Sequence, residues 1–91
     1  MIDITHKPTT LREAIAEATV SVSLANTIAA VKEWRVPKGD VLEAARVAGL
    51  FGIKRTADMI PDCHPLPLEH AEVTFDVQAM AILVRVKVRT I

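Results

Sequence analysis

The residue types best suited to chemistry lie in three short runs. Lys38-Gly39-Asp40 precedes a helical pattern, Lys54-Arg55-Thr56 lies near the end of that pattern, and Asp62-Cys63-His64 follows in a proline-rich loop. The N-terminus of a helix binds anions through free backbone N–H groups, and a glycine there lets a phosphate approach the backbone. The first run is equally typical of an ordinary turn before a helix, so alone it leaves both interpretations open.

The third run is stiffened by Pro61, Pro65 and Pro67. A rigid loop can hold His64 for acid–base work, because the pKa of histidine lies near neutrality. A zinc site needs three or four ligands, and the spacing of Cys63, His64 and the neighbouring acid does not match one. A cysteine nucleophile would need a separate orienting histidine and an oxyanion motif, which the sequence does not offer. These residues therefore indicate a candidate site without defining its chemistry.

Composition limits the classes of protein. The 91 residues are 51% hydrophobic and 24% charged, with 11 basic and 11 acidic side chains. This balance favours one globular domain over a disordered chain or a membrane span, and no net field favours nucleic acid. The single cysteine excludes an internal disulfide and favours the cytoplasm. The first seven residues lack the apolar run of a signal peptide, so we expect no targeting segment.

The hydrophobic pattern predicts five elements. We expect a mobile lead-in over residues 1–10 and a strand over 11–22, where alternating apolar residues outweigh the helix propensity of Ala and Glu. A helix of about three turns should begin at Ser23 and end before Pro37. A longer helix should begin at Asp40, with a capping box to Glu43, and run to residue 60. Alternating valines at 73–77 and 84–88 predict an antiparallel hairpin.

Two surface patterns accompany these elements. Ala45, Gly49, Gly52 and Thr56 follow one face of the long helix, which predicts a close approach by another element, within the monomer or across a subunit boundary. The hairpin carries acids on its first strand and bases on its second, so we expect opposite charges to pair between the two strands. The residues concerned are Glu72, Thr74, Asp76, Arg85, Lys87 and Arg89.

The predicted fold class is α+β. The order of elements matches an incomplete ferredoxin-like split βαβ sandwich, an antiparallel sheet with helices on one face, in which one more helix and strand would complete the pattern. We expect residues 1–91 to form a single domain, with the last strand at an edge of the sheet. A long apolar strand at an edge is prone to pair with other chains.

Together the runs resemble the MoaC family in order and spacing. The matching stretches are 36–49, 54–61 and 63–66, and they include Lys38-Gly39-Asp40, Lys54-Arg55-Thr56 and Cys63-His64-Pro65. The stretches 1–4 and 11–14 are similar to the family too, so the resemblance covers the whole chain.

The resemblance implies a step of molybdenum cofactor biosynthesis that needs no redox cofactor and no metal. The family converts (8S)-3',8-cyclo-7,8-dihydroguanosine 5'-triphosphate, a small-molecule substrate, into cyclic pyranopterin monophosphate with release of diphosphate. It implies a catalytic role for Lys38 and His64, and a place for Asp62, Cys63 and His64 in the substrate pocket. Arg12, Lys54 and Arg55 become candidate partners of the triphosphate, since a triphosphate needs several cations.

The sequence departs from the family in two respects. Asp62 stands where the family usually carries leucine, and a carboxylate there could raise the pKa of His64 or repel a phosphate. The family also continues with a helix rich in substrate-binding acids, a later aspartate and lysines, and a final strand. We therefore expect little synthase activity from these 91 residues alone.

Family members are hexamers of dimers with active sites at subunit interfaces, so the resemblance implies a homo-oligomer. The alternative hypothesis is a non-catalytic remnant that binds an anionic ligand or a full-length subunit. Binding of the cyclic intermediate without release of diphosphate would favour that alternative.

Overall fold

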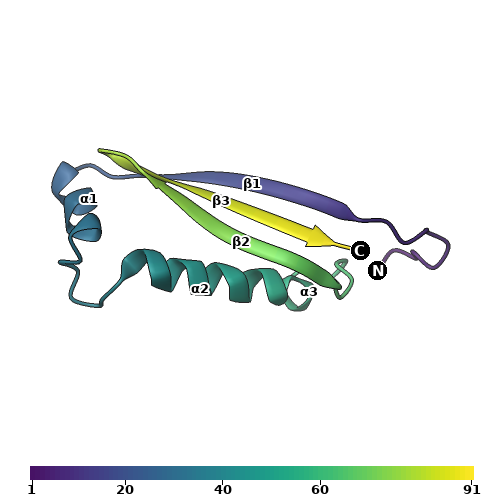
Figure 1. Ribbon diagram of the computed structural model, residues 1–91. Helices are drawn as coiled ribbons and strands as arrows, with labels where there is room; N and C mark the ends of the chain where they lie inside the picture. Colours follow the sequence, from purple (N-terminus) through teal and green to yellow (C-terminus); the bar gives the residue numbers. More distant parts are fainter.

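In the computed structural model, which describes residues 1–91, one strand is followed by three helices and then by two strands (Figure 1). The strands are β1 (Arg12–Ser21), β2 (Leu68–Val77) and β3 (Ala81–Thr90), and the helices are α1 (Ala25–Lys32), α2 (Val41–Lys54) and α3 (Thr56–Met59). β3 lies between β1 and β2 and is antiparallel to both. β1 and β2 are therefore parallel, separated by a strand and linked by helices, which is the split βαβ arrangement.

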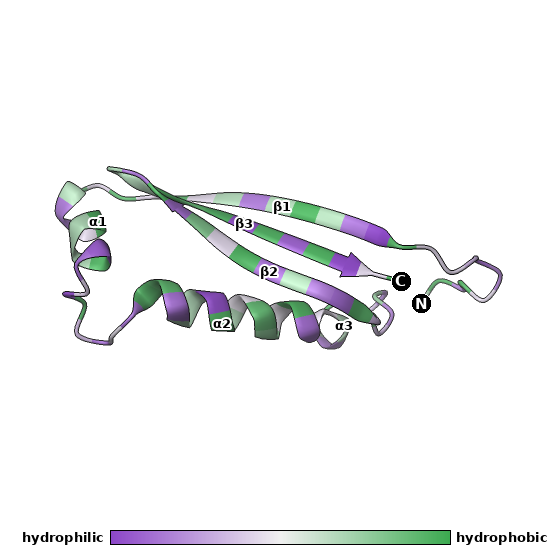
Figure 2. Cartoon of the chain, in the orientation of Figure 1, coloured by the Kyte–Doolittle hydropathy of each residue, from purple (hydrophilic) through white to green (hydrophobic).

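The strand alternation sorts side chains onto the two faces of the sheet, and Figure 2 shows polar and apolar residues alternating along each strand. Val73 of β2 faces α2, because a Cβ added at Gly49 of α2 would lie 2.9 Å from Val73 Cγ2. Val86 and Ala16 share this face, since the register pairs Val73 with Val86 and Val86 with Ala16. The predicted strand over residues 11–22 is thus confirmed, and its small alanines form part of the helix-side face.

The core is small. Ile28 and Val73 are the only buried residues, at 3% and 7% exposure, and every residue of β1 is exposed. The accessible surface is 6833 Å², whereas a compact protein of this mass exposes about 5,200 Å². α2 packs on β2, and the excess surface includes the uncovered helix-side face of β1. The single layer of helix predicted from the sequence is confirmed, and it covers only part of the sheet.

The long helix differs from the prediction at its far end. Asp40 caps α2 as expected, since its Oδ1 accepts a hydrogen bond from the Glu43 N–H at 3.1 Å. The second half of the expected capping box is absent, because the Glu43 carboxylate binds Arg46 instead. The prediction of one continuous helix to residue 60 is wrong, because α2 ends at Lys54 and Arg55 separates it from α3. The Thr56 hydroxyl donates to the carbonyls of Gly52 and Ile53 and begins the short α3.

The first helix is shorter than predicted. Ser23 does not cap it; Leu24 occupies the N-cap position without a side-chain hydrogen bond, and the helix ends at Lys32. Two hydrogen bonds close its end, from Arg35 N–H to Ala30 O at 2.9 Å and from Trp34 N–H to Val31 O at 3.4 Å. This is a Schellman motif, whose C′ residue must adopt a left-handed conformation. That residue is Trp34, with φ of 59°.

Trp34 stands where glycine is favoured, so we expect Trp34→Gly to stabilise the fold by about 0.5–1 kcal/mol. Trp34 is 71% exposed, so removing its indole loses little buried apolar surface. Trp34→Ala is the matched control, because it removes the indole and keeps a Cβ in the left-handed conformation. Urea denaturation followed by circular dichroism measures both variants. A glycine variant less stable than the alanine variant would contradict the expectation.

The outer face of the sheet carries the predicted charges with different partners. Arg85 pairs with Glu17, and both Lys87 and Arg89 pair with Glu13, so the bases of β3 pair with β1 and not with β2. The predicted pairing within the hairpin is wrong, because β3 is the central strand and the acids of β1 compete for its bases. The hydrogen bond from Arg89 holds the pKa of Glu13 below its ordinary value. The expectation that the last strand lies at an edge is wrong for the same reason.

Candidate functional site

The N-terminal segment, the start of β1 and the loop after α3 meet at one end of the sheet (Figure 1). Two open hollows lie there, of about 300 Å³ and about 260 Å³. Both are lined by Lys7, Arg12 and His64, together with Ile4 and Leu66. We call these two hollows the cationic cleft. Three nitrogen-bearing side chains around a shared space can hold an anion from several directions.

The loop that carries His64 is fixed by local hydrogen bonds. The Cys63 N–H donates to Ile60 O at 3.0 Å, and the Cys63 thiol donates weakly to His64 O at 3.4 Å. The Thr90 hydroxyl of β3 donates to Pro67 O at 3.1 Å and ties the loop to the end of the sheet. Arg12 pairs with Thr90 from the opposite side of β3, and it lines the smaller hollow together with Pro65, Leu66 and Pro67 of the loop.

Ion pairing separates the basic residues into two groups. Five of the 11 lysines and arginines form ion pairs with an Asp or Glu carboxylate. These five are Arg35, Arg46, Arg85, Lys87 and Arg89. The six that form none are Lys7, Arg12, Lys32, Lys38, Lys54 and Arg55. All four basic site residues predicted from the sequence belong to this second group. Cations without a carboxylate partner are available to an anionic ligand.

Two acids border the cationic cleft. Asp62 lines the larger hollow, is 77% exposed at its side chain and has the ammonium group of Met1 3.3 Å from its Oδ1. Asp3 accepts hydrogen bonds from the Thr5 N–H at 2.9 Å and the Thr5 hydroxyl at 2.8 Å. These bonds hold the pKa of Asp3 below its ordinary value, and the electrostatic influence of nearby His64 lowers it further. The cleft is therefore mixed in charge, with the cations outnumbering the acids on its lining.

Lys54 and Arg55 lie outside the cationic cleft. Lys54 lines a separate hollow of about 190 Å³ with Asp58, and this hollow shares Pro65 and Leu66 with the cleft. The Arg55 guanidinium lies over the Phe51 ring, 5.6 Å from its centroid. Neither side chain lines the hollows that hold His64 in this structure.

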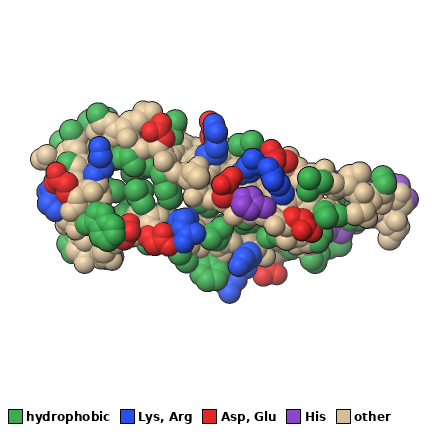
Figure 3. All heavy atoms as spheres, viewed as in Figure 1, with side chains coloured by type: hydrophobic (Ala, Val, Ile, Leu, Met, Phe, Trp, Pro, Cys, Tyr) green, Lys and Arg blue, Asp and Glu red, His purple; other side chains and the backbone are tan.

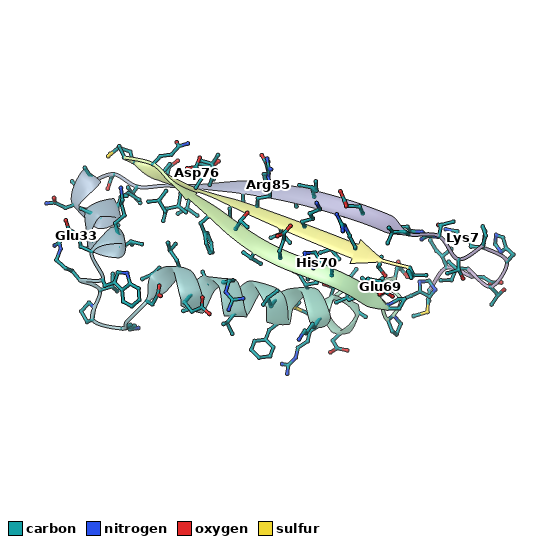
Figure 4. All side chains as sticks on the ribbon, in the orientation of Figure 1. Lys7, Glu33, Glu69, His70, Asp76 and Arg85 are labelled. Carbon is teal, nitrogen blue, oxygen red and sulfur yellow. The ribbon has the colours of Figure 1, made fainter.

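Lys38 lies at the opposite end of the molecule. It precedes α2, whose 14 residues span about 21 Å, and His64 follows the other end of that helix. Figure 4 labels Glu33 at one extreme, in the turn that precedes Lys38, and Lys7 at the other. Gly39, which follows Lys38, has a φ of 101° that favours glycine. One copy of the chain does not bring Lys38 to His64.

A further hollow of about 280 Å³ lies on the outer face of the sheet, beside Glu17, Asp76 and Arg85. Figure 3 shows acidic and basic side chains intermingled over one face of the protein. Because Arg85 is paired with Glu17, this hollow offers no free cation. No group of three or more His, Cys, Asp or Glu side chains is placed to hold a metal. None of the helices has the length and apolarity to cross a membrane.

Sequence reasoning missed Lys7 as a site residue. It lies in the lead-in that the sequence pattern gave no structure, and residues 1–10 are indeed exposed and outside any helix or strand. The chain turns at Ile4, where the Lys7 N–H donates to Ile4 O at 3.0 Å, and Lys7 reaches the cleft beside His64. The only signal in the sequence is a lysine five residues before Arg12, and the spacing alone does not predict that the two meet.

The fold and the cleft define an α+β protein in which two unpaired cations and a histidine line one open cleft. The chain belongs to the MoaC family, whose model matches residues 1–91. The resemblance drawn from the sequence runs is thereby confirmed.

Curated relatives support the same family. A cyclic pyranopterin monophosphate synthase of Cereibacter sphaeroides is 48% identical over 99% of this chain and 57% of its own length. The protein of the same name from Nitratidesulfovibrio vulgaris is 46% identical over 99% of this chain and 56% of its own length. A probable cyclic pyranopterin monophosphate synthase of Pyrococcus furiosus is 40% identical over 100% of this chain and 58% of its own length. The chain thus spans slightly more than half the length of these relatives.

Proposed function

We propose that this chain forms the cation-rich part of the active site of a cyclic pyranopterin monophosphate synthase in molybdenum cofactor biosynthesis. The reaction converts (8S)-3',8-cyclo-7,8-dihydroguanosine 5'-triphosphate into cyclic pyranopterin monophosphate and diphosphate. The observation that carries the proposal is the cationic cleft, in which Lys7 and Arg12 lack carboxylate partners and lie beside His64. The 48% identity to a synthase favours this function over a non-catalytic remnant.

The residues of the cleft suit the steps that the substrate requires. Lys7 and Arg12 bind the phosphate oxygens and stabilise the charge that develops as diphosphate leaves. His64 transfers protons during the rearrangement of the rings, since a histidine side chain suits general acid–base catalysis. Cys63 lines the larger hollow and shapes the ring side of the pocket.

Lys38 enters the site from a second copy of the chain. Within one copy it lies beyond the far end of α2 from His64, so it reaches the same substrate only across a subunit interface. Exposed apolar side chains on α2, including Val47 at 39% and Phe51 at 54%, provide surface for such an interface. We propose a cytoplasmic homo-oligomer, the hexamer of dimers implied by the family resemblance.

Isothermal titration calorimetry of the purified chain tests the proposal. We expect saturable binding of diphosphate and of the cyclic dihydroguanosine triphosphate, with affinity that falls as salt rises because the contacts are charged. Absence of binding to either ligand at low salt would contradict the proposal. Release of diphosphate, measured in the same samples, should be very slow, because relatives are longer than this chain and the family's further acids are expected in that additional length.

A further inference from the structure

The two hollows of the cationic cleft differ in their remaining residues. Only the larger is lined by Ile2 and Cys63, beside the shared Ile4 and Leu66, and Asp62 is the single carboxylate on its lining. The smaller adds Thr9 and three prolines and carries no acidic side chain, and its Thr90 hydroxyl already donates to Pro67 O. Lys7 and Arg12 line both hollows. The larger hollow, which has the carboxylate, suits a flat ring that offers N–H donors, and the smaller hollow, which has none, suits phosphate oxygens.

We infer that Asp62 selects the guanine-derived ring of the substrate by accepting hydrogen bonds from its ring N–H and 2-amino group. This inference rests on the proposed function and assigns one residue a role in specificity. A carboxylate has two acceptor oxygens and no donor, which matches two adjacent N–H donors on one edge of a planar ring. It repels phosphate, so the same charge directs the triphosphate to the smaller hollow.

The present contact of Asp62 fits this role. Its Oδ1 already faces a nitrogen donor, the ammonium group of Met1, at 3.3 Å. The carboxylate is 77% exposed, and an exposed ion pair of this kind is weak. A ligand that offers two N–H groups and a flat apolar surface can therefore replace it. The wall residues Ile2 and Ile4 would then cover one side of the ring.

Comparison of GTP with inosine triphosphate, which lacks only the 2-amino group, tests the inference. We expect the chain to bind GTP about tenfold more tightly, because one charge-assisted hydrogen bond is lost with the amino group. In Asp62→Asn the preference should fall below about twofold, since the amide presents only one acceptor oxygen. Diphosphate affinity should be unchanged or higher in this variant, because a negative charge has been removed.

Asp58→Asn is the matched control. Asp58 is an exposed acid of α3 that lines the hollow beside Lys54, outside the cationic cleft. Its replacement makes the same chemical change and should leave the preference for GTP at the wild-type value.

Equal affinity of the wild-type chain for GTP and inosine triphosphate, with diphosphate still bound, would overturn the role of Asp62 alone. Loss of diphosphate binding in Asp62→Asn would also overturn it, because the carboxylate would then be structural. Failure of the wild-type chain to bind diphosphate would instead overturn the proposed function.

Discussion

Replacing Arg12 with glutamine is expected to weaken diphosphate binding by about tenfold to a hundredfold. Arg12 lines both hollows of the cleft and has no carboxylate partner in the chain, so its guanidinium is free to bind phosphate oxygens. A hydrogen bond to a charged group is worth about 1.5–3 kcal/mol, which corresponds to that range of affinity. Calorimetry at two salt concentrations measures the loss, and the variant should also show a weaker dependence on salt.

Arg85→Gln is the matched control for Arg12→Gln. It removes the same charge from the sheet, but Arg85 is paired with Glu17 on the outer face. We expect diphosphate affinity to change by less than about twofold, because an exposed charge farther away than the Debye length is largely screened. Equal losses in the two variants would mean that binding follows the net charge of the protein and needs no cleft.

The hydrophobic pattern predicted the sheet well because alternation is a local property of the sequence. Residues 12–21 form a strand although Ala and Glu favour helix, because all ten pair with β3. The helix ends were predicted less well. The break at Arg55 depends on the Thr56 hydroxyl, and the end of α1 depends on a left-handed tryptophan, which propensity disfavours. The strand order could not be predicted from the pattern either, since the hairpin of β2 and β3 offers two open edges with which β1 could pair.

The lining of the cationic cleft could be predicted from the sequence only in part, because its residues come from separate segments. Cys63 and His64 are neighbours in a proline-rich loop, so the sequence places them together. Arg12 was predicted as a site residue only from the family resemblance. Lys7 was missed because its position depends on how an irregular segment folds back. Lys38 and His64 were predicted to act on one substrate, and α2 separates them within one chain. Contacts between distant segments or between copies are not encoded in local spacing.

The glycines of α2 give the second large effect, on stability. A Cβ added at Gly49 would lie 2.9 Å from Val73 Cγ2, closer than real Cβ contacts allow, and Val73 is one of the two buried residues. Val73 is β-branched and has little freedom to turn away. We expect Gly49→Val to destabilise the fold by about 2–3 kcal/mol, since α2 must move off the sheet. For a domain with so small a core, this is a large part of the total stability.

Gly52 provides the matched control one turn along the same helix. A Cβ added there meets nothing within 4 Å, so we expect Gly52→Ala to stabilise the fold by about 0.5–1 kcal/mol through helix propensity alone. The small-residue face predicted from the sequence therefore divides into one position that needs glycine for packing within the monomer and one that does not. Urea denaturation of both variants measures the difference.

The double variant Gly49→Val/Val73→Ala should lose less stability than the sum of its single changes, because the removed methyl groups make room for the new side chain. Additive losses would mean that the contact between α2 and β2 does not determine the effect.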